Sequence, residues 1–317
     1  MSLTLHLPKF EQSIVFFFYL SLEMAILFVG ITFLVGVLLE ILPPHRIGNI
    51  LSSRNGKGYV IGAGLGALTP FCSCSTIPMV VGMLRAQAGF GPTMTFLFTS
   101  PLVNPLLVGL LVLALGWKFT LIYSISALIV TICLGYLLEQ LNFSRFIRTD
   151  AIEKNSSEKH DKPPLPDARV KVALMHLLCD RSHIKIIFLN ALDQYKKFFP
   201  LITFGIGIGA FVHGFLPLDF FVDVAGSENP WAVPISAIIG IPLYVRASTM
   251  VPMIIPLAAK GVGLGSIAAL IIGAAGASLP EVIMIKRLVQ IPLLLAFLSS
   301  VFVIAVTTGL VINNVYN

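Results

Sequence analysis

The sequence is poor in charged residues and in cysteine, shows no nucleotide-binding signature, and so excludes several classes of protein. Only 11% of the 317 residues are charged, whereas 56% are hydrophobic. Soluble domains carry about 25% charged residues, and a soluble fold of this size could not hide so much apolar surface from water. No phosphate-binding loop, H-E-x-x-H motif or catalytic triad is recognisable, so the sequence predicts neither an ATP-driven pump nor an enzyme.

The chain has four cysteines, and they do not predict a disulfide framework. Cys179 lies in a charged segment of cytosolic character, where thiols stay reduced. Cys133 stands in an apolar block and is expected to serve helix packing. We expect no cofactor, and the net charge of +6 indicates the cytoplasmic loops of a membrane protein rather than nucleic-acid binding.

What the sequence does contain is a series of long apolar blocks. Residues 13–39 include a single formal charge, Glu23, and exceed the roughly 20 residues that a helix needs to cross a bilayer. This block is too long for the core of a signal peptide, so we interpret it as a retained membrane helix. Further blocks follow near residues 59–84, 90–115, 117–139, 198–216, 231–259, 264–285 and 288–312.

A charged stretch divides the blocks into two groups of four. Residues 141–197 hold 11 of the 21 Lys and Arg residues, and their early part has the Pro, Ser and Lys of a flexible linker. Residues 167–190 are amphipathic and are predicted to form a helix at the cytoplasmic interface. We therefore predict a first membrane repeat over 1–140, a charged cytoplasmic linker over 141–194, and a second membrane repeat over 195–317.

The two groups match each other when the sequence is shifted so that Gly66 falls on Gly240, a shift that we call the repeat offset. The matches fall mainly on glycine and proline, whose backbone geometry is the most constrained. Internal duplication of this kind is common in secondary transporters. The further matched pairs are Ser75 with Thr249, Pro78 with Pro252, Met79 with Met253, Gly89 with Gly263 and Gly91 with Gly265.

The distribution of basic residues predicts the topology. If every block crossed the membrane, Arg46 and Arg287 would lie outside, against the tendency of basic residues to stay on the cytoplasmic side. The blocks 59–84 and 231–259 are each broken near the middle, at Pro70 and Pro78 in the first and at Pro242 and Pro252 in the second. The first 11 residues of the former reach only about 16 Å. We therefore predict an all-α integral membrane protein of two inverted repeats, each with about three transmembrane helices and one broken, re-entrant helical hairpin.

The turn TPFCSCSTIP, residues 69–78, is the strongest local signal for chemistry. Irregular backbone at membrane depth is tolerated only where protein or a water-filled cavity surrounds it. Two thiols make a poor complete zinc site but suit a metalloid, so Cys72 and Cys74 are candidate metalloid ligands. Alternatively, both are small buried residues of a tight turn. The predicted substrate-binding residues of this turn are Thr69, Pro70, Cys72, Ser73, Cys74, Ser75 and Pro78.

The matching turn of the second half, GIPLYVRASTMVPM, places Arg246 at the position of Cys72. An arginine within an apolar block is costly and indicates a functional role. The alternative is an arginine that reaches, or snorkels, to the interface. The same turn contributes Tyr244, Ser248 and Thr249 as further predicted substrate-binding residues.

Three more polar residues lie inside apolar segments. Glu281, in GASLPE, is predicted either to pair with Arg246 or to carry a coupling proton, unless it is only a carboxylate at a helix end near Lys286. Asn104, in TSPLVNP, offers a polar group to a cavity between two prolines. For Glu23 a functional and a purely structural role stay equally open.

At these motifs the sequence resembles the ArsP/YraQ-type permease family. The resemblance rests on TPFCSCSTIP, the glycines at 89 and 91, TSPLVNP, GIPLYVRAST and GASLPE, which together span roughly residues 20–115 and 195–312. It implies a permease of the inner membrane; characterised relatives export trivalent organoarsenicals, and some are linked to arsenite or antimonite resistance. The family's thiols fall on Cys72 and Cys74. Arg246 stands where some relatives have a cysteine, which favours an anionic or thiol-conjugated substrate.

The sequence therefore predicts a multi-pass inner-membrane permease for a small thiol-reactive or metalloid-type solute, working by alternating access about Cys72, Cys74 and Arg246. A permease for a small sulfur-containing anion is the first alternative. An intramembrane thiol oxidoreductase, in which the two thiols exchange with disulfides, is the alternative of another class. The expected partners are the lipid bilayer and a small-molecule substrate, not nucleic acid; a homo-oligomer or an accessory protein stays open.

Overall fold

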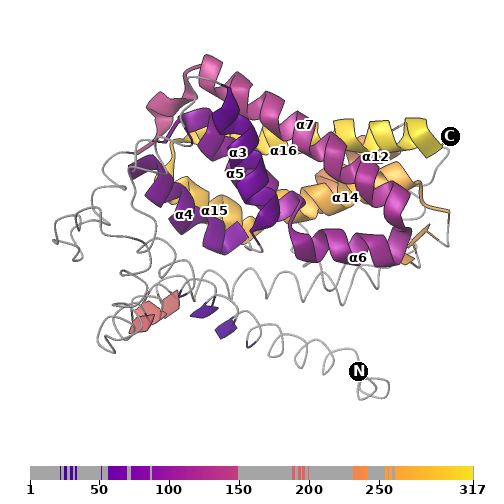
Figure 1. Ribbon diagram of the computed structural model, residues 1–317, viewed down its shortest axis with the longest axis horizontal. Coiled ribbons are helices and arrows are strands. Elements are labelled where there is room, and N and C mark those ends of the chain that lie inside the picture. The colour runs from indigo at the N-terminus through magenta and orange to yellow at the C-terminus, as the bar shows by residue number, and fades with distance from the viewer. Residues whose placement is uncertain are drawn as a thin grey trace.

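The protein is helical throughout the part of the chain that the structure describes. The computed structural model describes residues 51, 56–69, 73–85, 88–148, 231–241 and 261–316, with scattered positions between 22 and 33, 188 and 199, and 254 and 258. Within these residues the one pairing of strand type is an isolated antiparallel bridge between Ile147 and Val289. This agrees with the predicted all-α class (Figure 1).

The first half of the chain forms short helices followed by one long helix. They are α3 (Lys57–Leu68), α4 (Ser73–Arg85), α5 (Phe90–Leu102), α6 (Pro105–Leu115), α7 (Trp117–Gln140) and the 3-10 helix η2 (Phe143–Phe146). Between α5 and α6 the axis bends by 41°. Pro105 causes this bend, because a residue before proline avoids helical dihedrals, and Asn104 is accordingly extended at φ −74° and ψ 153°.

The described helices of the second half follow the same order, except that the counterpart of α4 lies mostly outside the described residues. The second half contains α12 (Ala232–Gly240), α14 (Leu264–Gly276), α15 (Leu279–Leu288) and α16 (Ile291–Tyr316). At the repeat offset, α5 coincides with α14 at both ends, and α6 and α7 begin where α15 and α16 begin. Each half thus has a 13-residue helix, a short interruption, a short helix and a long helix. The interruptions are residues 103–104 and 277–278.

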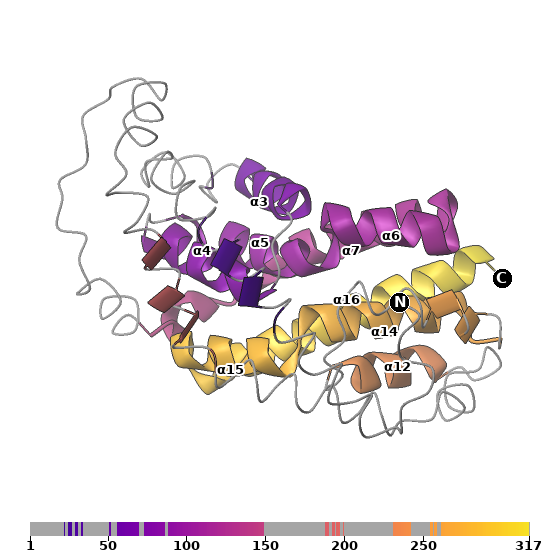
Figure 2. The same cartoon turned by 90° about the horizontal axis from the view of Figure 1, so that it is seen from below.

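The two long helices, α7 and α16, pack against each other and run antiparallel (Figure 2). Phe119, near the start of α7, lies against Tyr316 at the end of α16, with ring centroids 6.4 Å apart. At the other end, the chain that follows α7 pairs with the chain that precedes α16 through Ile147 and Val289. We call the end where α7 finishes the linker end, and the opposite end the far end.

Two shorter helices of the first half, α3 and α5, begin at the linker end. Tyr59, in the first turn of α3, donates a hydrogen bond to the carboxylate of Glu139 near the end of α7. The same carboxylate accepts from the backbone N–H of Gly91, at the start of α5, at 3.1 Å. α5 ends inside the protein, where the hydroxyl of Tyr123 on α7 donates to the carbonyl of Leu102 at 3.1 Å. From there α6 continues toward the far end and joins α7.

Among the described residues, α7 and α16 are long and apolar enough to cross a membrane, and the bent pair of α5 and α6 is a third candidate if it forms one span. Basic residues mark the linker end, where Lys57 begins α3 and Lys286 lies in the last turn of α15. Trp117 and Trp231, the two tryptophans of the sequence, are exposed at the starts of α7 and α12, toward the far end. Tryptophans at a membrane–water interface and basic residues on the cytoplasmic side are both typical of membrane proteins.

In both halves, a side-chain oxygen accepts a hydrogen bond from a backbone N–H at the start of the 13-residue helix. Glu139 accepts from the N–H of Gly91, and the side-chain oxygen of Asn313 accepts from the N–H of Gly265 at 2.9 Å. Glu139 and Asn313 are themselves paired at the repeat offset. A Cβ on either glycine would overlap the accepting side chain, so the close approach requires glycine. These matched contacts give a physical reason for the glycine pair found at this offset.

Candidate functional site

The interruptions of the two halves meet in the interior of the protein. A Cβ on Gly276, the last residue of α14, would lie 3.2 Å from Cδ2 of Leu102, the last residue of α5. α5 and α14 therefore end beside each other, and α6 and α15 begin nearby. We call this place, residues 102–104 and 276–278, the central interruption. Because helix N-termini carry partial positive charge, two positive helix ends lie there.

Buried hydroxyl groups connect the first turn of α4 with the central interruption. Oγ1 of Thr76 lies 3.2 Å from Oγ of Ser100, in the last turn of α5, and both side chains are fully buried. The neighbouring Thr99 pairs with Thr131 of α7, also at 3.2 Å. Thr76 follows Cys74 by two residues in the same helix, so the C-S-C-S motif adjoins a helix start beside the end of α5.

Thr76→Val should loosen the start of α4 while keeping the size of the side chain. The substitution removes one hydroxyl of a buried pair, which costs about 1 kcal/mol. We expect N-ethylmaleimide to modify Cys74 about fivefold faster, because losing about 1 kcal/mol of stabilisation makes opening of this turn about fivefold more frequent. Thr76→Ser, which keeps the hydroxyl, should react at the wild-type rate. Mass spectrometry of the labelled peptide measures both rates, and equal rates would show that the hydroxyl pair does not hold this turn.

The predicted site residues divide into those that the structure places and those outside its described part. Thr69 ends α3, and its hydroxyl donates to the carbonyl of Leu65 at 2.8 Å. Asn104 caps α6, since its side-chain oxygen accepts from the backbone N–H of Leu107 at 2.7 Å. Both therefore have a local role at a helix end. The backbone of Ser73, Cys74, Ser75 and Pro78 belongs to α4, whereas Glu23, Pro70, Cys72, Tyr244, Arg246, Ser248 and Thr249 lie outside the described residues.

Glu281 is a buried carboxylate at the central interruption. It lies in the first turn of α15, three residues after the N-cap residue Ser278, and its exposed fraction is 0%. A helix N-terminus stabilises negative charge, which offsets part of the cost of burying this group. Oγ of Ser278 is also buried and has no hydrogen-bond partner among the described residues. Polar groups therefore lie inside the protein where α15 begins.

Sequence reasoning did not select the aromatic residues beside the interruption. Tyr123 is fully buried, and its hydroxyl donates to the carbonyl of Leu102 at the end of α5. Its counterpart at the repeat offset, Phe297, lacks the hydroxyl and stacks on Phe98 with centroids 5.4 Å apart. Polar residues within apolar blocks were the available signal, but many of them bond only to the preceding turn, as Ser126 does to the carbonyl of Ile122 at 2.6 Å.

Cys133 does not have the packing role that the sequence suggested. Its side chain is exposed on α7, so that prediction was wrong. Its exposure also makes Cys133 a suitable control for experiments on the other thiols. Within the described residues, no group of three or more His, Cys, Asp or Glu side chains is arranged to hold a metal ion.

Comparison with known proteins identifies the family. A family model of ArsP type, described as a predicted permease, matches residues 9–314. The chain belongs to this permease family. The match covers both halves and the segment between them, and it confirms the resemblance seen in the motifs. The family is a class of membrane permeases and not a class of enzymes.

The relatives agree with this assignment. The UPF0718 protein MJ0584 of Methanocaldococcus jannaschii is 24% identical, over 79% of this chain and 80% of its own length. The UPF0718 protein YraQ of Escherichia coli K12 is 24% identical, over 34% of this chain and 31% of its own length. A Streptococcus mutans protein, described as a candidate subunit of a two-component membrane permease complex, is 32% identical, over 31% of this chain and 30% of its own length. No solved structure matches the chain.

Proposed function

We propose that this permease lies in the inner membrane with several spans and moves a small thiol-reactive or metalloid-type solute, similar to an organoarsenical. The observation that carries the proposal is the position of α4, whose first turn is held beside the last turn of α5 by Thr76 and Ser100. Broken helices inside a membrane transporter surround its substrate site. Thiols adjoining such a helix start suit a soft solute in transit.

The proposed architecture is a pair of inverted repeats, 1–140 and 195–317, joined by a cytoplasmic linker over 141–194. Three features support it. The helix bounds recur at the repeat offset, equivalent side chains accept from the starts of α5 and α14, and the equivalent long helices α7 and α16 run antiparallel. A repeat that is inverted across the membrane produces this antiparallel relation between equivalent helices.

We also propose that α3 and α4 form a re-entrant hairpin that carries the thiols at its tip. α3 begins at the linker end beside Glu139, and α4 returns toward it, since Leu84 lines the same pocket as Ile147. The helices have 12 and 13 residues. At ~1.5 Å per residue each is about 18–20 Å long, which is less than the roughly 30 Å of a hydrocarbon core.

In the proposed mechanism the solute binds to Cys72, Cys74 and Arg246 near the midplane. The two repeats then rock about this site and expose it alternately to either side of the membrane. Since the sequence shows no ATP-binding motif, we propose a proton or ion gradient as the driving force, with Glu281 or Glu23 as the proton carrier. The burial of Glu281 at the central interruption supports its selection as the first candidate.

A small sulfur-containing anion is the second candidate substrate. The observation that favours it is the meeting of the N-terminal ends of α6 and α15 at the central interruption, because half-helix N-termini bind anionic groups in transporters. Arg246 supplies a further positive charge in the sequence. We include an accessory membrane protein among the proposed partners, because one relative is described as part of a two-component complex.

The test is the accumulation of trivalent methylarsenical in cells that lack their own arsenic exporters. Wild type should lower accumulation, and Cys72→Ser should abolish the effect. Arg246→Ala tests the charge in the same assay. Cys133→Ser is the matched control, since this thiol is exposed on α7 and should be dispensable. Equal accumulation with wild type and empty vector, with the protein shown to be in the membrane, would contradict metalloid export and favour the sulfur-containing anion.

A further inference from the structure

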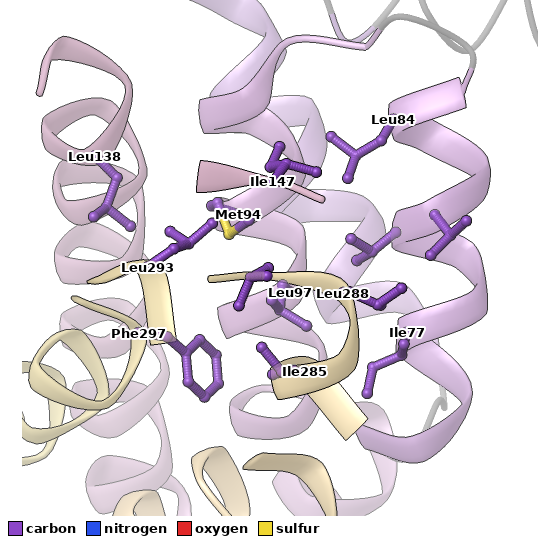
Figure 3. A pocket seen from close by; sticks show the side chains of 13 residues that line it. Ile77, Leu84, Met94, Leu97, Leu138, Ile147, Ile285, Leu288, Leu293 and Phe297 are labelled. Atoms are coloured by element: carbon purple, nitrogen blue, oxygen red, sulfur yellow. The ribbon is translucent and has the colours of Figure 1, made fainter. Parts of the chain in front are cut away.

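An apolar pocket separates the first half from the second on the linker side (Figure 3). α4 and α5 form most of one wall, and α15 and α16 form the other. All the lining side chains are Ile, Val, Leu, Met or Phe, among them Val80 and Phe297. Ordered water needs polar partners, so a pocket lined in this way stays dry. The junction between the two halves therefore contains free space without a polar lining.

The pocket lies on the route from the candidate site to the linker end. α4 and α15 both begin near the central interruption, and both run toward the linker end. In Figure 3, Ile77 and Ile285 lie together at one end of the pocket, and Leu84 and Ile147 lie at the other. The pocket therefore lies between the central interruption and the linker end, with α4 on one side and α15 on the other.

A short backbone clasp covers the outer end of the pocket. Ile147 and Val289 form the antiparallel bridge. The N–H of Arg148 donates to the carbonyl of Leu288 at 3.0 Å, and the N–H of Gln290 donates back across the bridge at 2.9 Å. The side chains of Ile147, Leu288 and Val289 line the pocket from this side. The clasp thus ties the early part of the linker, residues 146–148, to the second half.

Toward the far end, the described side chains that match three of the pocket residues are fully buried, and we call the part of the protein around them the filled region. Two of its side chains are larger than their counterparts, because Phe replaces Leu and Tyr replaces Phe. All three are 0% exposed. They are Leu111, Phe119 and Tyr123, which match Ile285, Leu293 and Phe297 at the repeat offset. Among the described residues, α7 therefore places larger buried side chains toward the far end than α16 places around the pocket.

We propose that the pocket is the closed linker-side segment of the solute pathway and that the clasp is its gate. The proposal rests on the proposed transport function, since a gate requires a pathway. At the far end, buried side chains of α6 and α7 oppose separation of the halves. At the linker end, the two backbone hydrogen bonds of the clasp and the apolar contacts around the pocket oppose separation of the halves. On this proposal the linker end is the side that opens, because the clasp joins residues 146–148 of the linker to residues 288–290 of the second half.

The first experiment measures access to the pocket and does not depend on any substrate. Ile285→Cys reports on the pocket, and Leu111→Cys is its offset counterpart in the filled region. Each reporter is labelled with a water-soluble maleimide in permeabilised membranes and read peptide by peptide by mass spectrometry. Arg148→Pro removes one hydrogen-bond donor of the clasp, whereas Arg148→Ala keeps it. We expect Arg148→Pro to speed labelling at Ile285→Cys about fivefold relative to Arg148→Ala, the effect of one lost hydrogen bond, without change at Leu111→Cys.

Equal labelling of Ile285→Cys in the two Arg148 variants would overturn the proposal. A rise at both reporters would indicate general loosening, and Ile147→Ala would then decide. This variant keeps the backbone bonds but uncovers the mouth of the pocket, so it must speed labelling at Ile285→Cys alone or the proposal fails.

A second experiment closes the gate. Ile147→Cys with Val289→Cys should form a disulfide, because the two residues are a non-hydrogen-bonded pair of an antiparallel bridge. The Cα atoms of such a pair lie about 4.5 Å apart, which a disulfide can span. Oxidation should stop methylarsenical efflux, and reduction should restore it, whereas each single variant should be unaffected. Efflux that continues through the closed disulfide would overturn the gate. If wild type shows no efflux at all, the proposed substrate fails, and the labelling experiment still decides the gate.

Discussion

Gly265→Ala should prevent α14 from packing against α16 and leave little folded protein in the membrane. A Cβ at this position would overlap the carbonyl oxygen of Gly309 and the side chain of Asn313. The carbonyl belongs to a 26-residue helix, which cannot move aside locally. The hydrogen bond from Gly265 to Asn313 would be strained as well. Overpacking costs about 1–3 kcal/mol, and more where backbone has to shift, so we expect a loss at or above the upper value.

The matched control for this prediction is Gly109→Ala on α6, where a Cβ would meet nothing within 4 Å. Alanine favours a helix over glycine by about 1 kcal/mol. The control should therefore be at least as stable as wild type. The measurements are the yield of monodisperse protein after detergent extraction and its melting temperature. A Gly265→Ala protein that melts with wild type would show that α14 and α16 do not approach so closely.

The order of helices in each half could be predicted because glycine and proline mark it locally. Gly89 and Gly263, paired at the repeat offset, are the N-cap residues of α5 and α14. Pro105 forces the bend that separates α6 from α5. Glycine and proline influence the backbone at their own positions whatever packs around them, so a single sequence is enough to interpret them.

Contacts between distant helices could not be predicted in this way. Glu139 and Gly91 are 48 residues apart, as are Asn313 and Gly265. Each acceptor stands near the end of an apolar block and looks like an ordinary residue of the membrane boundary. The common spacing becomes meaningful only once the helices are arranged in space.

The candidate site was selected from residues that are unusual in apolar blocks, namely the thiols, Arg246 and Glu281. The Thr76–Ser100 pair and the pocket depend on how α4 lies against α5 and α15, which no local pattern specifies. Cys133 shows the same limit. α7 buries small and polar residues such as Thr131 and Gly135 and exposes large apolar ones such as Ile129, so hydropathy alone did not reveal that Cys133 is exposed.

Glu281→Gln should abolish solute flux driven by a proton gradient and leave the exchange of bound solute across the membrane intact. The side chain has no exposed surface in this conformation, so a change in its protonation requires the surrounding helices to move. This coupling of protonation to movement is what a proton-driven carrier needs. Glutamine keeps the shape of the side chain but cannot take up or release the proton. The variant therefore loses the driving force while the rocking of the repeats remains possible.

The measurement uses protein reconstituted in vesicles, with trivalent methylarsenical as the probe. Net uptake is followed under an imposed pH gradient, and exchange is followed in vesicles loaded with the same compound. Glu139→Gln is the matched control, because this carboxylate holds the start of α5 near the linker end, away from the central interruption. Unchanged gradient-driven uptake in Glu281→Gln, or the loss of exchange together with uptake, would contradict the role of proton carrier. Selective loss of uptake would mean that the proton binds where α15 begins, beside the broken helices, so that proton and solute would compete for or share one interior space.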